Sequence, residues 1–444
     1  MFTTKEISEI IKNHNIAKYE KLQKYYEGKQ DILQRTVSDA SKPNNQLVNN
    51  FPGYITDVNT GYFMGKPVSY TVREDKAEML EDIQDIFSYN DEGEVNMELA
   101  KTASIKGKAY EILYTETDSR NINNTIVRFG NLEPDNIILG YNNKITAEPI
   151  FAIRYFKDID ILTKKETIFV EFYDNQTVKY YEKQGEGELI LTAEEEHYFD
   201  DVPIIEYQNN RERMSDFEKV LTLIDAYDLS RSNETNIVEQ NDDGSFLKIV
   251  NLSGTLSEDI DEMKQKKVIM VDGDGDVSWI LKEINDKAMQ NHNETLRNDI
   301  HIFSKTPNLT DESFAQNLSG VAIEFKLWPL EQTAAQKERK FKKGLQRRIE
   351  LICNFLRKKG KDYDWRDVAI TFSRNMPQNT KELSEMIEKL TGLISERTAL
   401  SILPFIDNVQ QELDFREQER ENIIRIPEID NEDEEDEAGE NNEE

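Results

Sequence analysis

The sequence predicts an α+β protein, and three observations support this prediction. Between residues 125 and 207, apolar residues recur at every second position, as they do in β-strands. Before and after this stretch they recur at every third or fourth position, as they do in amphipathic helices. Residues 285–360 combine two helical patterns with a polar loop between them. With 444 residues, 37% of them hydrophobic, the chain is long enough for two or three domains.

The first 115 residues are expected to mix helices with short strands. One amphipathic helix is predicted over residues 4–28, followed by a polar connector over residues 29–46. Gly65 and Pro67 end a second predicted helix, which starts near Asn50. The other elements expected here are a strand at 68–72, helices at 77–87 and 94–106, and a strand at 109–115.

Residues 125–207 are expected to form an antiparallel sheet with turns at 141–143 and 174–175. The segment is rich in Tyr and Phe. Aromatic residues at alternating strand positions pack a sheet face more often than they stack on nucleic-acid bases, so packing is the preferred interpretation. The predicted strands are 126–129, 137–139, 150–156, 167–173, 178–182 and 188–191.

The chain turns helical again at Ser215, because Ser215 and Glu218 have the spacing of a capping box. Apolar residues follow at helical spacing as far as Tyr227, whereas residues 230–243 are almost entirely polar. The helix is therefore expected to leave a packed body and to continue among polar neighbours or water.

A possible calcium-binding loop follows. Its four carboxylates occupy positions 1, 3, 5 and 12 of a helix–loop–helix calcium motif: Asp272, Asp274, Asp276 and Glu283. However, Val277 stands where the motif requires glycine, and residues 268–271 have the pattern of a strand. A hairpin with an Asp-Gly-Asp-Gly tip explains the same residues. These carboxylates are weak candidates, and no metal or other cofactor is expected.

Residues 285–303 carry a thin apolar stripe, and residues 304–319 have the composition of a loop. A helix is predicted over residues 321–359, with Pro329 as the residue expected to kink it. At 1.5 Å per residue this helix is about 60 Å long. One face is apolar from Phe341 to Leu356, and the rest is crowded with basic residues: Lys337, Arg339, Lys340, Lys342, Lys343, Arg347 and Arg348.

The C-terminal region is expected to contain a strand at 367–374 and helices at 379–390, 396–402 and from 407 to the residues before Pro427. Beyond Pro427 there are eleven acidic residues and no basic one, which predicts a disordered tail. The net charge of −32 opposes tight sequence-independent binding of DNA, which depends on neutralising phosphates. It is compatible with a channel through which duplex DNA slides freely.

Enzymatic motifs are missing from the sequence. No GxxxxGK[ST] loop, HExxH or GxSxG motif occurs, and the histidines His14, His197, His292 and His301 are scattered. Cys353 is the only cysteine and lies on the apolar side of the long predicted helix, so a core position is expected. No run of about 18 apolar residues and no signal-peptide pattern is present, so we expect no membrane contact.

Several short stretches stand in a defined order along the chain. They are Pro43-Asn44-Asn45, Leu47-Val48-Asn49-Asn50-Phe51-Pro52, Thr60-Gly61-Tyr62-Phe63-Met64-Gly65-Lys66-Pro67-Val68, Asp299-Ile300-His301-Ile302-Phe303-Ser304, Thr306-Pro307-Asn308, Ser319-Gly320-Val321-Ala322, Glu338-Arg339-Lys340-Phe341 and Phe372-Ser373-Arg374-Asn375-Met376-Pro377. In order and spacing they resemble the portal proteins of long-tailed double-stranded-DNA bacteriophages. The resemblance covers residues from about 40 to 410.

This resemblance implies a portal fold with a defined domain order. The expected parts are an α+β wing (1–214), an outer stem helix (215–245), a small α/β clip (246–282), an inner stem helix (283–303), a tunnel loop (304–319), a long kinked helix (320–360), a strand returning to the wing (361–378), crown helices (379–426) and the acidic tail (427–444).

The resemblance also implies a function. Such proteins form a ring, usually of twelve subunits, at one capsid vertex, through which double-stranded DNA is packaged, retained and ejected. The implied partners are further copies of the chain, the terminase motor, a head-completion or adaptor protein, and the major capsid and scaffolding proteins. The implied location is the virion, and the host cytoplasm during assembly. The implied DNA-channel residues are Ser304, Lys305, Asn308, Asp311, Glu312, Gln316 and Asn317.

The basic face of the long helix suggests contacts between subunits. Its candidate residues are Arg339, Lys340, Lys343 and Arg347, which would face carboxylates of a neighbour, and the face as a whole would point away from DNA. Two other functions stay open from the sequence. One is a ring-forming connector or capsid assembly protein that never contacts DNA, and the other, more distant, is a metal-dependent nuclease. We expect no enzymatic activity.

Overall fold

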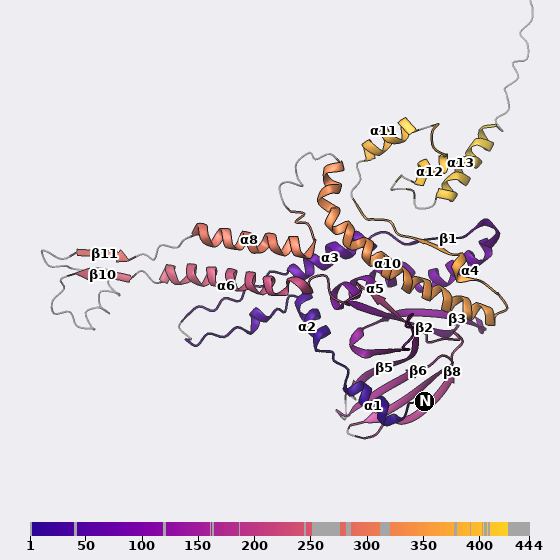
Figure 1. Ribbon diagram of the computed structural model, residues 1–444, viewed down its shortest axis with the longest axis horizontal. Coiled ribbons are helices and arrows are strands. Elements are labelled where there is room, and N and C mark those ends of the chain that lie inside the picture. Colours follow the sequence, from indigo (N-terminus) through magenta and orange to yellow (C-terminus); the bar gives the residue numbers. More distant parts are fainter. Residues whose placement is uncertain are drawn as a thin grey trace, which may run out of the picture. The chain divides into compact units, whose positions relative to one another are not determined.

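The computed structural model describes residues 2–39, 42–118, 121–159, 161, 164–185, 187–243, 246–250, 276–280, 286–310, 320–376, 380–390, 392–401, 403, 406 and 409–424. The chain divides into two compact units, Met1–Asn375 and Met376–Glu444, and each is described by itself. Helices and sheets both contribute to the first unit, as predicted (Figure 1). No described helix is both long and apolar enough to cross a membrane.

The helices of the first unit follow the predicted periodicity closely, with one correction. The helix expected over residues 4–28 is two helices, because Asn13 caps the first and the Asn15 side chain accepts a hydrogen bond from the amide of Ala17, which opens the second. The helices are α1 (Thr4–Lys12), α2 (Ala17–Tyr26), α3 (Phe51–Met64), α4 (Ala77–Asn90), α5 (Glu92–Lys106), α6 (Leu221–Asp243), α8 (Asp286–Ser304) and α10 (Gly320–Lys358).

The expected antiparallel sheet is in fact two sheets. A three-stranded sheet has the order β3-β2-β9, and a five-stranded sheet has the order β4-β5-β6-β7-β8. The strands are β2 (Lys108–Asp118), β3 (Asn121–Leu132), β4 (Ile137–Tyr141), β5 (Pro149–Ile159), β6 (Glu166–Tyr173), β7 (Thr177–Gln184), β8 (Ile190–Glu196) and β9 (Ile204–Gln208). The periodicity did not indicate β9, whose five residues pair with β2, about 95 residues earlier.

Two small antiparallel pairs complete the strands of the first unit. β12 (Ala369–Thr371) pairs with β1 (Ser69–Thr71), so the C-terminal strand pairs with residues expected to belong to the wing, and not with the sheet of residues 125–207. β10 (Phe246–Val250) pairs with β11 (Asp276–Ile280) in the region expected to be the clip. The tip of the predicted Asp-Gly-Asp-Gly hairpin lies outside the described residues.

The main core lies where α10 crosses the three-stranded sheet. Phe341, Leu345 and Ile349 of α10 pack against Tyr207 of β9 and Leu113 of β2 in one buried cluster. Cys353 is also buried there, and burial raises the pKa of its thiol to about 12, so the predicted core position is confirmed. The five-stranded sheet is covered on one face by α1, through residues such as Ile7, and packs its other face against the three-stranded sheet.

The second unit contains the helices expected near the C-terminus. They are α11 (Thr380–Leu390), α12 (Glu396–Ser401) and α13 (Val409–Ile424). Arg416 of α13 forms an ion pair with Glu396 at the start of α12. The acidic tail lies outside the described residues, so its predicted disorder stays a prediction.

Candidate functional site

The candidate site begins with two long helices that lie side by side, α6 and α8 (Figure 1). Where they leave the body, Phe217, Val220, Ile224 and Ile300 form an apolar cluster. Further along, their contact is polar. Ser230 Oγ lies 2.6 Å from Asn293 Oδ1, and Asn293 Nδ2 donates to Glu234 Oε2 at 3.1 Å. The predicted change from a packed to a polar environment along this helix is confirmed.

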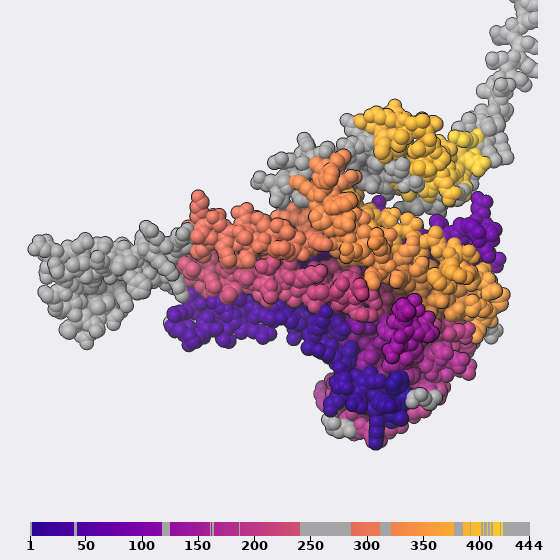
Figure 2. Space-filling view, viewed as in Figure 1, coloured from indigo at the N-terminus to yellow at the C-terminus, as the bar shows by residue number. Residues whose placement is uncertain are grey.

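An extended segment over residues 45–49 lies along α6 on the side away from α8, so three layers adjoin in Figure 2. The amides of Asn45 and Leu47 donate to the side chains of Asn236 and Ser232 at 2.8 and 2.9 Å. The amide of Asn49 donates to Asp228 Oδ1 at 2.9 Å. Every second residue of the extended segment thus contacts every fourth residue of α6. The spacings match because two extended residues and four helical residues both span about 6 Å.

Asp228 is the buried end of this ladder. The side-chain amide of Asn49 also donates to its Oδ1, whereas Oδ2 has no hydrogen-bond partner among the residues that the structure describes. Burial raises the pKa of this carboxyl to about 6, against the two hydrogen bonds from Asn49 that favour its charged form. The sequence indicated only a polar connector here, since the partners lie about 180 residues apart.

The segment that follows α8 is held against α3. The Tyr54 hydroxyl donates to the carbonyl of Pro307 and accepts from the amide of Leu309, both at 2.9 Å. Asn59 Nδ2 donates to Thr306 Oγ1 at 2.8 Å. Ser304 and Thr306 are consequently only 8% and 1% exposed. Ser304 therefore belongs to a buried anchor in the single chain, and its assignment to the DNA channel stays a prediction.

His301, in the last turn of α8, supports the same segment. Its Nδ1 lies 3.0 Å from the carbonyl oxygen of Thr306, and since a carbonyl only accepts, Nδ1 carries the proton. Burial lowers the pKa of His301, so the ring is neutral near pH 7. The ring lies edge-on to those of Phe51 and Tyr54, with centroids 5.8 Å apart in each case.

The other predicted channel residues fall into two groups. Lys305 is exposed with a positive φ of 58°, and Asn308 is half-buried, with its side chain accepting from the amide of Thr310. Asp311, Glu312, Gln316 and Asn317 lie outside the described residues, as do three of the calcium candidates, Asp272, Asp274 and Glu283. Asp276 is the first residue of β11. No group of three or more His, Cys, Asp or Glu side chains in the described part could hold a metal ion.

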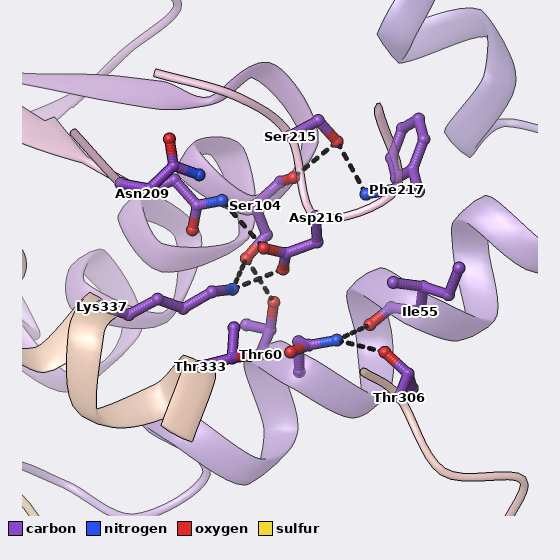
Figure 3. Close-up of polar contacts among 12 residues, drawn as sticks. Ile55, Thr60, Ser104, Asn209, Ser215, Asp216, Phe217, Thr306, Thr333 and Lys337 are labelled. Atoms are coloured by element: carbon purple, nitrogen blue, oxygen red, sulfur yellow. Dashed lines mark hydrogen bonds and ion pairs between the residues drawn. The ribbon is translucent and has the colours of Figure 1, made fainter. Parts of the chain in front are cut away.

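The basic face of α10 is not a single surface. Lys337 is buried and donates to Ser104 Oγ at 2.8 Å and to the carboxylate of Asp216, as Figure 3 shows. Arg348 is fully buried against Glu111. These two residues were not among the subunit-interface candidates, and their partners come from elsewhere in the same chain, so the basic residues of α10 do not form one exposed face.

The four subunit-interface candidates differ in whether they form ion pairs within the chain. Arg347 forms ion pairs with Asp201 at 2.6 Å and Glu350 at 2.7 Å. Arg339, Lys340 and Lys343 make no ion pair with any carboxylate in the described part of the chain. These three keep their charges available to a neighbour, so their interface role stays a prediction, and Arg347 is the least suited of the four.

Large apolar side chains are exposed on both sides of the loop. Phe325 and Trp328, in the first turns of α10, are 74% and 60% exposed, and Ile302 and Phe303 at the end of α8 are exposed to a similar degree. Large apolar side chains exposed to this degree are candidates for contact with another protein surface. Of these residues the predicted apolar stripes included only Phe303, and the fold shows that all four side chains are exposed.

An α+β body, two long helices that meet through polar contacts at their far end, and an anchored segment between the second of them and a third long helix are the arrangement expected of a head-to-tail connector protein. Residues 7–425 match the family "Phage portal protein, SPP1 Gp6-like", so the chain belongs to this family of phage portal proteins. The resemblance seen in the sequence is thereby confirmed. Family membership brings a role in DNA packaging, a ring assembly and a place in the virion.

Two relatives show how far the similarity extends. The portal protein of Clostridium phage phiCD119 is 26% identical over 409 residues, which cover 87% of this chain and 89% of the relative. The portal protein of Bacillus phage SPP1 is 26% identical over 448 residues, covering 94% of this chain and 86% of the relative. The similarity therefore extends over both compact units of the chain.

Proposed function

We propose that this chain forms a ring, of twelve subunits as is usual in the family, in which α8 lines a channel for double-stranded DNA and residues 310–319 reach furthest toward the DNA. The observation that carries this proposal is the anchored segment 304–309. It joins the end of α8 to a loop whose origin is held firmly on the body. The capsid vertex, the terminase motor and a head-completion protein are the partners expected for such a ring.

The charges of α8 suit a channel through which DNA moves. Its described residues include Asp286, Glu294 and Asp299 against Lys287 and Arg297, a small negative excess that the ring multiplies. A surface of this sign does not neutralise phosphates, so DNA is not held tightly by it. The buried pairing of Lys337 and Arg348 removes two cations that would otherwise have been available to bind DNA.

Deleting residues 311–316 tests this function. Rings are expected to form as in the wild type, because the anchor at 304–309 is kept, while packaged DNA escapes and the yield of filled heads falls to background. The measurement is electron microscopy of rings together with nuclease-protected DNA in heads. A matched deletion of the exposed residues 144–146, in the turn between β4 and β5, should leave both unchanged. Wild-type retention in the first deletion would contradict the channel assignment.

Ring closure gives a second prediction. Replacing Phe325 and Trp328 together by serine is expected to leave a folded subunit that no longer closes into rings, because large exposed aromatic residues commonly dominate the free energy of an interface. Size-exclusion chromatography with light scattering measures the assembly. The control replaces Ile145 and Ile161, equally exposed on other loops, by serine. Intact rings in the aromatic double variant would show that these side chains are not at the subunit interface.

A further inference from the structure

One hydroxyl group, that of Tyr54, contacts two backbone groups in the first part of the proposed tunnel loop. The Tyr54 hydroxyl uses its hydrogen toward the Pro307 carbonyl and its lone pair toward the Leu309 amide, both at 2.9 Å. Both partners are backbone groups, two residues apart. The contact therefore sets the path of the chain whatever side chains the loop carries.

The surroundings of Tyr54 keep this hydroxyl in place. Tyr54 lies on α3, and its ring meets the neutral His301 ring at nearly a right angle, 88°. Further along α3, the side-chain amide of Asn59 donates to the Ile55 carbonyl and to Thr306 Oγ1, both at 2.8 Å (Figure 3). This amide therefore holds Thr306, the residue before Pro307. Residues 306, 307 and 309 are thus all bonded to α3 or to the last turn of α8.

From these contacts we infer that Tyr54 is a positioning residue for DNA retention, because it fixes the path of residues 307–309, from which the proposed tunnel loop continues. This inference rests on the proposed function.

The test is the Tyr54→Phe variant, which keeps the aromatic ring and removes only the hydroxyl. The Leu309 amide loses its acceptor, so its hydrogen exchange in the assembled ring is expected to become roughly 2- to 10-fold faster, as for one lost hydrogen bond. Retention of packaged DNA should fall, while ring formation and thermal unfolding stay as in the wild type. Tyr26→Phe is the matched control, because that hydroxyl donates to Asp57 on α3 at 3.1 Å, away from the loop.

The outcomes separate this inference from the function on which it rests. Unchanged exchange at Leu309 would overturn the contact itself. Faster exchange with wild-type DNA retention would overturn the positioning role, even if deletion of residues 311–316 still releases the DNA. Wild-type retention in that deletion would instead remove the proposed function, whatever the exchange rate at Leu309. Faster exchange with reduced retention in Tyr54→Phe, and neither change in Tyr26→Phe, supports the inference.

Discussion

Replacing Arg348 by methionine is expected to lower the free energy of unfolding by about 3–5 kcal/mol, the usual cost of removing one partner of a buried ion pair. Arg348 is fully buried on α10, with Nη2 2.7 Å from Glu111 Oε1 and Nη1 3.1 Å from Glu92 Oε1. Its guanidinium also lies 4.6 Å from the ring centroid of Phe129. Methionine fills much of the volume but leaves the Glu111 carboxylate buried without a cation.

The pH dependence of this variant follows from Glu111. Burial raises the pKa of the Glu111 carboxyl, and Arg348 opposes that rise. Without Arg348 the pKa rises further, so the folded variant binds a proton that the unfolded chain releases near its ordinary pKa. Stability then falls as pH increases through the raised pKa, and the deficit relative to wild type should be larger at pH 8 than at pH 5.

Urea unfolding at these two pH values measures both effects. Arg339→Met is the control, since Arg339 is exposed on the same helix and its replacement should change stability by no more than about 0.5 kcal/mol. Adding Glu111→Gln to Arg348→Met should recover part of the loss and remove its pH dependence. If the free energy of unfolding of Arg348→Met lies within about 1 kcal/mol of the wild-type value, the ion pair between Arg348 and Glu111 is not important for stability.

Gly344→Ala is expected to lower stability by about 1–3 kcal/mol, as overpacking in a core does. A methyl group at this position of α10 would lie 2.4 Å from Cε1 of Tyr207. That ring cannot easily move, because it is fully buried and its hydroxyl donates to Glu111 at 2.8 Å. The predicted sign is opposite to the ordinary preference for alanine over glycine inside helices, which is worth about 1 kcal/mol.

Gly61→Ala provides the matched control for this effect. Gly61 lies inside α3, and a methyl group there would meet no atom within 4 Å. The substitution should therefore stabilise the protein by about 0.5–1 kcal/mol, through helix propensity alone. Thermal unfolding of both variants measures the difference. If Gly344→Ala and Gly61→Ala change the thermal stability in the same direction and by the same amount, the close approach of α10 to β9 is not the reason for glycine at residue 344.

Elements specified by local pattern were predicted well. The two helices on either side of the loop, α8 and α10, were expected at 285–303 and 321–359 and are found at Asp286–Ser304 and Gly320–Lys358. The apolar spacing of these helices and the polar composition between them can be recognised from residues that are neighbours in the sequence. The same is true of the polar stretch at 230–243. The order of motifs from residue 40 to 410 was likewise enough to indicate the family before any fold was known.

Elements that depend on distant partners were not predicted. β9 is only five residues long and is a strand because β2 pairs with it. The split into two sheets depends on pairings that a period of two cannot distinguish. In the same way, residues 45–49 form no regular element by themselves, and their backbone amides are bonded to α6 through Asp228, Ser232 and Asn236.

By itself the sequence determined the family, the α+β class, the positions of α8 and α10 and the burial of Cys353, because periodicity, breakers and motif order are all local along the chain. Only the tertiary structure decided where charges and hydroxyls act. Lys337 and Arg348 lie among the basic residues of one helix in the sequence, yet the fold buries them against Asp216 and Glu111, 121 and 237 residues away. Tyr54 meets Pro307 across 253 residues in the same way. Such contacts depend on chain folding in three dimensions, which no local pattern encodes.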